Sequence, residues 1–139
     1  MIKHSKQNIL IIYGPNMNLL GLRKVGDRVG ITLDKLNRHL REAANERGLS
    51  ITIFQTNDES RAVSQLQRQR KKIKGILMFP GPWQQSGYVI RDTLEILSIP
   101  YITISLEEKV NVLKGVMNIE GKDIYKSIEN ALSTLAELI

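Results

Sequence analysis

The feature that constrains the fold most is a buried-strand pattern that ends directly in a polar loop. The segment NILIIYG, residues 8–14, is an apolar run rich in β-branched side chains, which is typical of a parallel strand covered on both faces. The loop that follows, residues 14–30, reads GPNMNLLGLRKVGDRVG. Gly14 and Pro15 favour a tight turn where the strand ends. The pattern therefore predicts a loop that presents polar side chains beyond the edge of a buried sheet.

Short apolar runs alternate with helical periods along the rest of the chain. Further strands are expected at 50–57, 75–81, 101–106 and 115–121, and helices between Thr32 and Gly48 and at 59–74, 87–98 and 122–139. Thr32 and Ser86 are the expected N-caps of two of these helices. Strands that alternate with helices form right-handed βαβ units. We therefore predict one domain over residues 1–139, a flavodoxin-like three-layer α/β sandwich whose five-stranded parallel sheet has the order 2-1-3-4-5.

Composition narrows the class of function. The 139 residues include no cysteine and two histidines, His4 and His39, so we expect neither disulfides nor a metal centre. The net charge is +6, much of it in residues 61–74. No aromatic side chains interleave with these charges, which favours a solvated helix end over a nucleic-acid surface. No apolar run has the length of a membrane helix or of a signal-peptide core, so we expect a cytoplasmic protein without membrane contacts.

The predicted topology gives the place of a ligand site. In open parallel sheets, ligands bind beyond the carboxyl ends of the strands, where the strand order reverses. Here this switch point lies between the first and third strands. Loops 14–30 and 79–87 and the end of the fourth strand, residues 105–107, should meet there. Their amide and guanidinium groups suit a small anionic or carbonyl-bearing ligand.

Most side chains in this predicted cleft also have a structural alternative. Asn16 and Asn18 could bind a ligand or satisfy backbone groups of their own loop. Arg23 could close over a carboxylate or an enolate, or lie free at the surface. Trp83 could be a lid, a wall or a subunit contact. Arg91 could face the cleft or form a surface salt bridge.

Acid–base groups are scarce in the same loops. They contain no histidine, and the only candidate acids of the cleft are Asp27 and Glu107 or its neighbour Glu108. A general acid–base enzyme needs a group whose pKa lies close to the working pH. The residues alone therefore indicate a polar, anion-binding cleft with weak catalytic equipment.

The segment ILIIYGPNMNLLGLR resembles the opening signature of the type II 3-dehydroquinate dehydratases, a hydrophobic run followed by N-G-P-N-x-N-x-L-G-x-R. The segments FQTNDES, GILMFPGPWQQSGYVIRDTL, IPYITISL and GVMNIEGKDIY are similar, in the same order, to later motifs of that family. The resemblance implies a flavodoxin-like fold and trimers that assemble into a dodecamer. It also implies dehydration of 3-dehydroquinate to 3-dehydroshikimate, in the shikimate pathway, with neither cofactor nor metal.

The resemblance also implies roles for single residues. In the family, a lid tyrosine activated by a lid arginine removes a proton, an asparagine holds a water against the resulting enolate, and a histidine protonates the leaving hydroxyl. Asn16 matches the asparagine and Arg23 matches the lid arginine. The backbone N–H groups of Leu106 and Glu107 match those that bind the substrate carboxylate. Arg91 matches a family arginine involved in binding and assembly.

The sequence departs from the family where acid–base chemistry is expected. Where the family has its lid tyrosine, this chain has Arg28 or Val29, and where the family has a histidine at the end of strand four, this chain has Ser105. The family's asparagine before P-G is replaced by Phe79, and its histidine in the loop after strand three is replaced by Gln85. The segment after strand four is also shorter than the family's. The loss of one acid–base group typically lowers a rate by about 10²–10⁴-fold.

These observations lead to a set of site residues and three hypotheses. The predicted catalytic residues are Asn16, Arg23 and Ser105, and the predicted ligand-binding residues are Phe79, Gly81, Trp83, Gln85, Leu106, Glu107 and Arg91. The favoured hypothesis is a divergent homo-oligomeric lyase, cyclase or isomerase that acts on a small anionic or carbonyl-bearing metabolite, with Asp27, Ser105 or Glu107 as candidate proton carriers. The alternatives are a non-catalytic small-molecule-binding or assembly relative, and a 3-dehydroquinate dehydratase with unusual active-site residues. The oligomer would be a trimer or a dodecamer.

Overall fold

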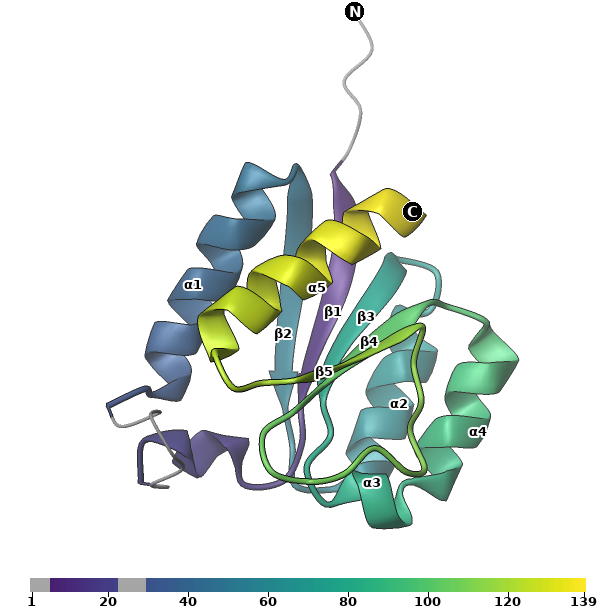
Figure 1. The fold of residues 1–139 in the computed structure, drawn as a ribbon. Helices are drawn as coiled ribbons and strands as arrows, with labels where there is room; N and C mark the ends of the chain where they lie inside the picture. Colours follow the sequence, from purple (N-terminus) through teal and green to yellow (C-terminus); the bar gives the residue numbers. More distant parts are fainter. Residues whose placement is uncertain (1–5, 23–29) are drawn as a thin grey trace, which may run out of the picture.

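A computed structural model describes residues 6–22 and 30–139. Its strands are β1 (Gln7–Tyr13), β2 (Leu49–Gln55), β3 (Ile73–Phe79), β4 (Tyr101–Ser105) and β5 (Met117–Glu120), and its helices are the 3-10 helix η1 (Met17–Leu22), α1 (Leu33–Glu46), α2 (Glu59–Gln69), α3 (Trp83–Ser86), α4 (Tyr88–Leu97) and α5 (Ile124–Leu138). All strand pairs are parallel and the sheet order is β2-β1-β3-β4-β5. Figure 1 shows α1 and α5 on one face of this sheet and α2 and α4 on the other. The predicted fold class and strand order are confirmed.

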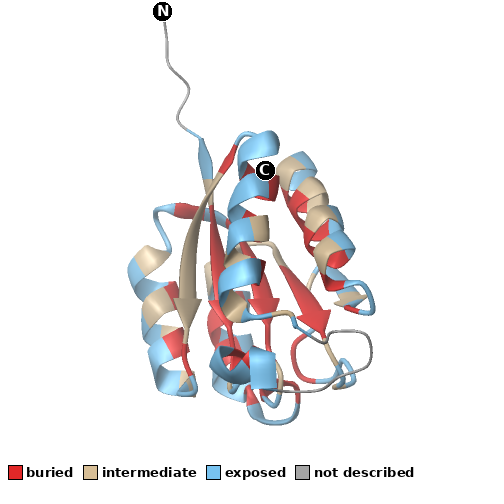
Figure 2. Ribbon diagram, turned by 90° about the vertical axis from the view of Figure 1, so that its left-hand side faces the viewer, coloured by how far each residue is buried: buried red, intermediate tan, exposed pale blue. Residues whose placement is uncertain are grey.

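Two hydrophobic cores hold the three layers together. Alternate side chains of β1 enter opposite cores, because successive residues of a strand point to opposite faces. Ile9 and Ile11 pack in the core beneath α1 and α5, whereas Leu10 and Ile12 pack in the core beneath α2 and α4. In Figure 2 the central strands are buried and the outward faces of the helices are exposed. Burial on both faces explains the apolar runs in the central strands β1 and β3, whereas β2 and β5 are less buried and include polar residues.

Side-chain caps define where three helices begin. The hydroxyl of Thr32 accepts from the N–H of Lys35, as the sequence predicts. Asp58 and Asp123 cap α2 and α5 in the same way. The prediction that Ser86 caps the helix after β3 is wrong. An additional helical turn, α3, precedes α4, so Ser86 ends α3 and its hydroxyl donates to the carbonyl of Pro82 at 3.4 Å.

The basic segment after α2 also differs from the sequence-based expectation. The predicted helix 59–74 ends at Gln69. A turn follows, in which the N–H of Lys72 donates to the carbonyl of Gln69 at 2.8 Å. Ile73 then belongs to β3, opposite Asn8, and its side chain is buried. Ile73, which the predicted helix 59–74 includes, is thus a buried strand residue instead.

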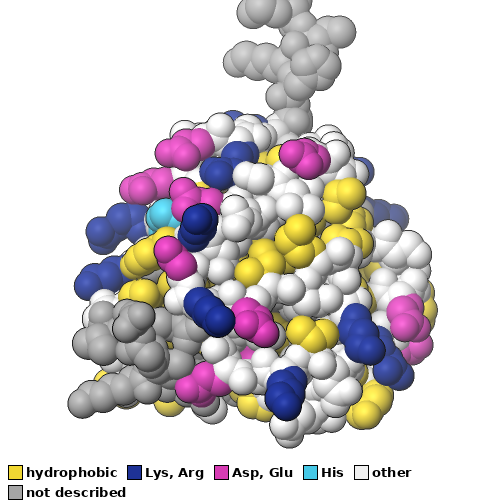
Figure 3. All heavy atoms as spheres, viewed as in Figure 1, with side chains coloured by type: hydrophobic (Ala, Val, Ile, Leu, Met, Phe, Trp, Pro, Cys, Tyr) yellow, Lys and Arg dark blue, Asp and Glu magenta, His cyan; other side chains and the backbone are white. Residues whose placement is uncertain are grey.

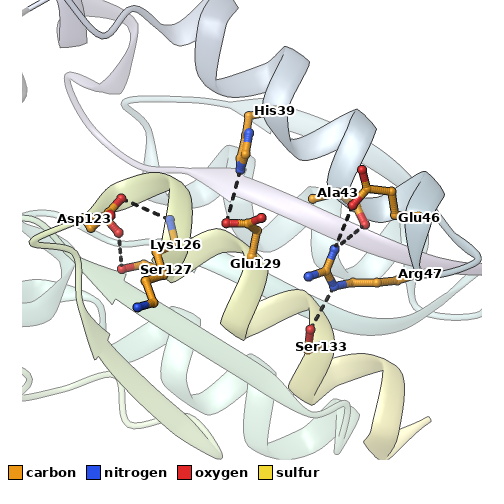
Figure 4. Close-up of polar contacts among 9 residues, drawn as sticks. All are labelled: His39, Ala43, Glu46, Arg47, Asp123, Lys126, Ser127, Glu129 and Ser133. Atoms are coloured by element: carbon orange, nitrogen blue, oxygen red, sulfur yellow. Dashed lines mark hydrogen bonds and ion pairs between the residues drawn. The ribbon is translucent and has the colours of Figure 1, made fainter.

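Polar contacts tie α1 to α5 on the outer surface of the first core (Figure 4). The Nε group of Arg47 donates to the hydroxyl of Ser133 at 2.8 Å, and its Nη1 group donates to the carbonyl of Ala43. His39 Nε2 lies 3.8 Å from a carboxylate oxygen of Glu129. On the face that carries α5, cationic and anionic side chains are interspersed (Figure 3). Within residues 6–22 and 30–139, no helix is both long enough and apolar enough to cross a membrane.

Candidate functional site

The carboxyl ends of β1, β2 and β3 lie level with one another. Tyr13, the last residue of β1, pairs with Gln55 on one side and with Phe79 on the other. The N–H of Gly14 then donates to the carbonyl of Phe79 at 2.8 Å. A Cβ atom at Gly14 would lie 2.7 Å from the carbonyl oxygen of Pro80 and 2.8 Å from that of Phe79. Only glycine therefore allows the two loops to meet at the switch point in this way.

Asn16 occupies the turn that follows. Its φ of 69° lies in the left-handed region, which asparagine tolerates better than most residues. Its N–H donates to the side-chain oxygen of Asn57 at 3.0 Å, and Gln55 donates to the same oxygen and to the carbonyl of Gly14. The turn is thus held by two amide side chains from the β2 end, and the side chain of Asn16 is left exposed. Asn57 and Gln55 are not among the predicted site residues, because neither lies on the β1 or β3 loop.

Phe79 and Tyr13 form an aromatic pair beneath this turn. Their ring centroids are 5.0 Å apart, and both side chains are fully buried. The Tyr13 hydroxyl donates to the side-chain oxygen of Asn37 at 2.8 Å. Burial raises the pKa of Tyr13 well above its usual value, and the charge of Arg41 opposes this shift only in part. Tyr13 is therefore unsuited to remove a proton at neutral pH, and the structure gives Phe79 a packing role.

The short helix α3 holds the loop between β4 and β5. Gln84 is completely buried, and its side-chain oxygen accepts from the N–H groups of Asn111 and Leu113 at 3.0 and 2.9 Å. Its side-chain nitrogen donates to the carbonyl of Leu113 at 2.9 Å. Trp83 is buried in the same core as Val112 and Leu113. Trp83, which the sequence allows as a lid, a cleft wall or a subunit contact, thus packs inside the chain, which gives it a structural role.

Two further predicted residues lie just before α3 and within it. Gly81 adopts a φ of 53°, and a Cβ atom there would lie 3.6 Å from the carbonyl oxygen of Pro15. This contact again brings the β3 loop close to the β1 loop. Gln85 is exposed at the surface of α3. The neighbouring Gln84, which the sequence did not distinguish from Gln85, has the greater structural importance.

Ser105 ends β4 at the floor of a cavity. The cavity has a volume of about 550 Å³ and is lined by residues 105–110 and 120–122. Ser105 is buried, with 4% of its surface exposed, and its hydroxyl has no hydrogen-bond partner within the part of the chain that the structure describes. A buried hydroxyl without a partner is costly in a folded protein. Ser105 therefore lines a cavity of ligand size, while its hydroxyl oxygen is itself buried.

The backbone N–H groups of Leu106 and Glu107 point at a carboxylate in this structure. They donate to Oε1 and Oε2 of Glu108, each at 3.3 Å. One carboxylate therefore bridges two consecutive amides, which is the arrangement that the family resemblance implies for a substrate carboxylate. Here the carboxylate comes from the chain itself. The sequence analysis named Glu108 only as an acid of the loop.

Arg91 lies apart from this cavity. It is exposed on α4, and its guanidinium group lies 5.0 Å from the ring centroid of Tyr88. It lines a separate cavity of about 340 Å³, together with Tyr101 and Lys114. A third cavity, of about 420 Å³, lies at the β2 end and includes Asn57. Within this chain, Arg91 and Ser105 therefore line different cavities.

Two predicted residues cannot be placed relative to these cavities. Arg23 and Asp27 lie in residues 23–29, outside the described residues. Between residues 6 and 22 and from residue 30 onward, no group of three or more His, Cys, Asp or Glu residues could hold a metal ion. The ionisable acids of the described β4 end are Glu107 and Glu108.

Comparison with protein families identifies a close match. The sequence profile of the family described as dehydroquinase class II matches residues 7–113. This span contains the ends of β1, β3 and β4. Two curated relatives are 3-dehydroquinate dehydratases. That of Trichodesmium erythraeum is 37% identical over 99 residues, which are 71% of this chain and 66% of the relative. That of Pelotomaculum thermopropionicum is 34% identical over 98 residues, which are 70% and 68% of the two chains. The chain thus matches about two thirds of each relative's length.

Comparison with solved structures extends the likeness to the whole fold. The type II dehydroquinase from Propionibacterium acnes superposes with a TM-score of 0.82 at 27% identity, over 97% of this chain and 99% of the other. The fold similarity therefore continues through β5 and α5, beyond the segment that the family profile matches.

Proposed function

Because the chain belongs to the class II dehydroquinase family, we propose that it is a slow 3-dehydroquinate dehydratase whose ligand lies beyond the carboxyl ends of β1, β3 and β4. The observation that carries this proposal is the family match over residues 7–113, which includes all three strand ends. The junction of Gly14 with the carbonyl of Phe79 supports it, because this contact holds two of the loops together at the switch point.

The proposed reaction is an acid–base elimination without a cofactor. A base removes a proton beside the ketone, the electrons form an enolate, and the β-hydroxyl group leaves with a proton as water. The exposed side chain of Asn16 is the proposed donor toward the enolate, directly or through water. The buried hydroxyl of Ser105 is the proposed donor toward the leaving group. Arg23 remains a proposed lid residue.

The available groups explain why we propose slow turnover. A serine hydroxyl is a weaker acid than an imidazolium, and the pKa of Tyr13 is raised by burial rather than lowered toward neutrality. Each acid–base group contributes about 10²–10⁴-fold to a typical rate. The expected turnover is therefore lower than that of a family member that has both the tyrosine and the histidine.

A spectroscopic assay tests this proposal. The absorbance of the conjugated enone product should increase when the protein is mixed with 3-dehydroquinate, and the Asn16→Gly variant should slow this increase by about 10²-fold or more. Glu137→Gln is a matched surface control, since Glu137 is exposed in the last turn of α5, at the other end of the sheet from the proposed site (Figure 1). No increase at protein concentrations equal to the substrate concentration would contradict dehydratase activity.

A second candidate function is lyase, cyclase or isomerase chemistry on a different small carbonyl compound. The observation that favours it is Glu108, whose carboxylate already lies on the amides of Leu106 and Glu107. Binding of quinate without turnover of 3-dehydroquinate would favour this candidate, or a purely ligand-binding protein, over the dehydratase.

We also propose a cytoplasmic homo-oligomer, either a trimer or a dodecamer. Several large apolar side chains are exposed in the single chain, and their burial between subunits would favour assembly. Leu22 is 80% exposed and Ile96 is 73% exposed. Light scattering of the purified protein measures the mass of the particle, and a monomer at micromolar concentration would contradict assembly.

A further inference from the structure

The carboxylate of Glu108 occupies a binding position that an external ligand could also use. It accepts hydrogen bonds from two consecutive backbone N–H groups, those of Leu106 and Glu107, at 3.3 Å each. Two adjacent amides that converge on one carboxylate form an anion cradle, here defined as the N–H groups of Leu106 and Glu107. Both residues line the cavity above β4, so the cradle opens into a space large enough for a small metabolite.

The charges around the cavity affect how strongly the cradle can bind a second carboxylate beside that of Glu108. Three carboxylates, those of Glu107, Glu108 and Glu120, and two ammonium groups, those of Lys109 and Lys122, line it. The carboxylates exceed the ammonium groups by one. An incoming carboxylate must therefore compete with Glu108 for the two N–H groups and overcome repulsion from a like charge nearby.

Ser105, the last residue of β4, also lines this cavity. Its hydroxyl is buried at the cavity floor and has no hydrogen-bond partner among the described residues. Ser105 is adjacent in sequence to the cradle, and its carbonyl accepts from the N–H of Gly121 at 2.7 Å, which fixes the strand end against the loop after β5.

We infer that Glu108 is a specificity-determining residue that occupies the cradle in the unliganded protein and competes with the carboxylate of a ligand. The inference rests on the proposed function only in assigning the ligand to this cavity. The cradle selects between ligands by their charge. A carboxylate-bearing ring binds more weakly because it must displace Glu108 from the cradle, whereas the neutral ester of the same ring leaves Glu108 in place.

Calorimetric titration with quinate and with its methyl ester tests the inference. Neither compound has the ketone on which the proposed elimination depends, so binding is measured without turnover. Glu108→Gln and Glu108→Ala should each bind quinate about tenfold more tightly than the unaltered protein, because a competing negative charge is removed. Affinity for the methyl ester should change by less than about twofold, since the ester does not compete for the cradle. The control Glu137→Gln makes the same change of charge far from the cavity and should match the unaltered protein.

Amide NMR spectra provide a second readout that requires no assumption about affinity. Glu108→Ala should shift the Leu106 and Glu107 amide resonances, and quinate should shift them back toward their original positions. Equal quinate affinity in the unaltered protein and both variants would overturn the inference, as would equal tightening for quinate and its ester, or no quinate binding by Glu108→Ala. If 3-dehydroquinate is not turned over but Glu108→Ala binds quinate more tightly, the dehydratase proposal fails and the role of Glu108 stands.

Discussion

Gln84 and Leu113 are joined by two hydrogen bonds in opposite directions. The side-chain oxygen of Gln84 accepts from the N–H of Leu113, its side-chain nitrogen donates to the carbonyl of Leu113, and both distances are 2.9 Å. One buried amide thereby satisfies both backbone groups of a residue 29 positions away. This pairing positions the loop that runs from the cavity at the β4 end to β5.

We expect Gln84→Leu to destabilise the protein strongly. The substitution keeps most of the side-chain volume but leaves the two N–H groups and one carbonyl that Gln84 contacts without partners, which should lower the free energy of unfolding by about 3 kcal/mol. Urea denaturation measures the change. The control Gln85→Leu alters an exposed neighbour and should change stability by less than about 0.5 kcal/mol. Equal effects at the two positions would contradict the role assigned to Gln84.

Gly14→Ala should disrupt the contact between the β1 and β3 loops. The added Cβ atom would lie 2.7 Å from the carbonyl oxygen of Pro80, and overpacking of this kind costs about 2 kcal/mol. Gly48→Ala is a useful comparison, because Gly48 has a φ of 68° and open space around it. Its cost of about 1 kcal/mol should come from the backbone alone. Dehydratase activity, if present, should fall only in Gly14→Ala.

Substitutions at Asn16 separate the effect of its backbone conformation on stability from the effect of its side-chain amide on turnover. Asn16→Gly tolerates the observed φ of 69°, so stability should change by less than about 0.5 kcal/mol. Asn16→Ala should cost about 1 kcal/mol more, because alanine is strained in this region. Both variants remove the side-chain amide and should lower turnover by about 10²-fold or more. Full activity in Asn16→Gly would exclude the proposed contact with the enolate.

Ser105→Ala should make the unliganded protein more stable. The substitution removes a buried hydroxyl that has no partner among the described residues, which should raise the free energy of unfolding by about 1 kcal/mol. Ser127→Ala is the matched control, since the Ser127 hydroxyl donates to the carbonyl of Asp123 at 2.8 Å. It should lower stability by about 1 kcal/mol. A loss of stability in Ser105→Ala would show that its hydroxyl is satisfied in solution.

Because Tyr13 is buried, we expect the protein to lose stability at alkaline pH. Burial raises the pKa of Tyr13 above the value of 10.0 that applies when the chain is unfolded. Below pH 10 the phenol is neutral in both the folded and the unfolded chain, so it does not make the free energy of unfolding depend on pH. Above pH 10 the phenol ionises more readily in the unfolded chain, so the free energy of unfolding decreases as the pH rises. The decrease approaches about 1.4 kcal/mol per pH unit. Tyr13→Phe should be less stable at pH 8, because the bond to Asn37 is lost, and should recover relative to the unaltered protein at pH 11. Parallel curves for the two proteins from pH 8 to 11 would contradict this prediction.

Sequence patterns predicted the sheet more fully than they predicted the polar network of the site. The apolar runs of β1 and β3 were predictable because a strand covered on both faces needs apolar side chains at successive positions, whereas the more exposed β5 gave a weaker pattern. The limits of α2 were harder to predict, since Ile73 satisfies a helical period as well as a strand position. Trp83 was considered as a lid because polar neighbours surround it in sequence, although in space it packs against Val112 and Leu113.

The amino-acid sequence by itself determined the layers, the parallel strand order and the family, because these depend on local periodicity and on motifs such as the one around Gly14 and Asn16. The tertiary structure decided which groups meet at the end of β4. The pairing of Gln84 with Leu113 and the placement of the Glu108 carboxylate on two amides depend on hydrogen-bond geometry. Hydrogen bonds require distances and angles that only the folded chain establishes, so residue type and spacing could name Glu108 as an acid but not as the occupant of an anion cradle.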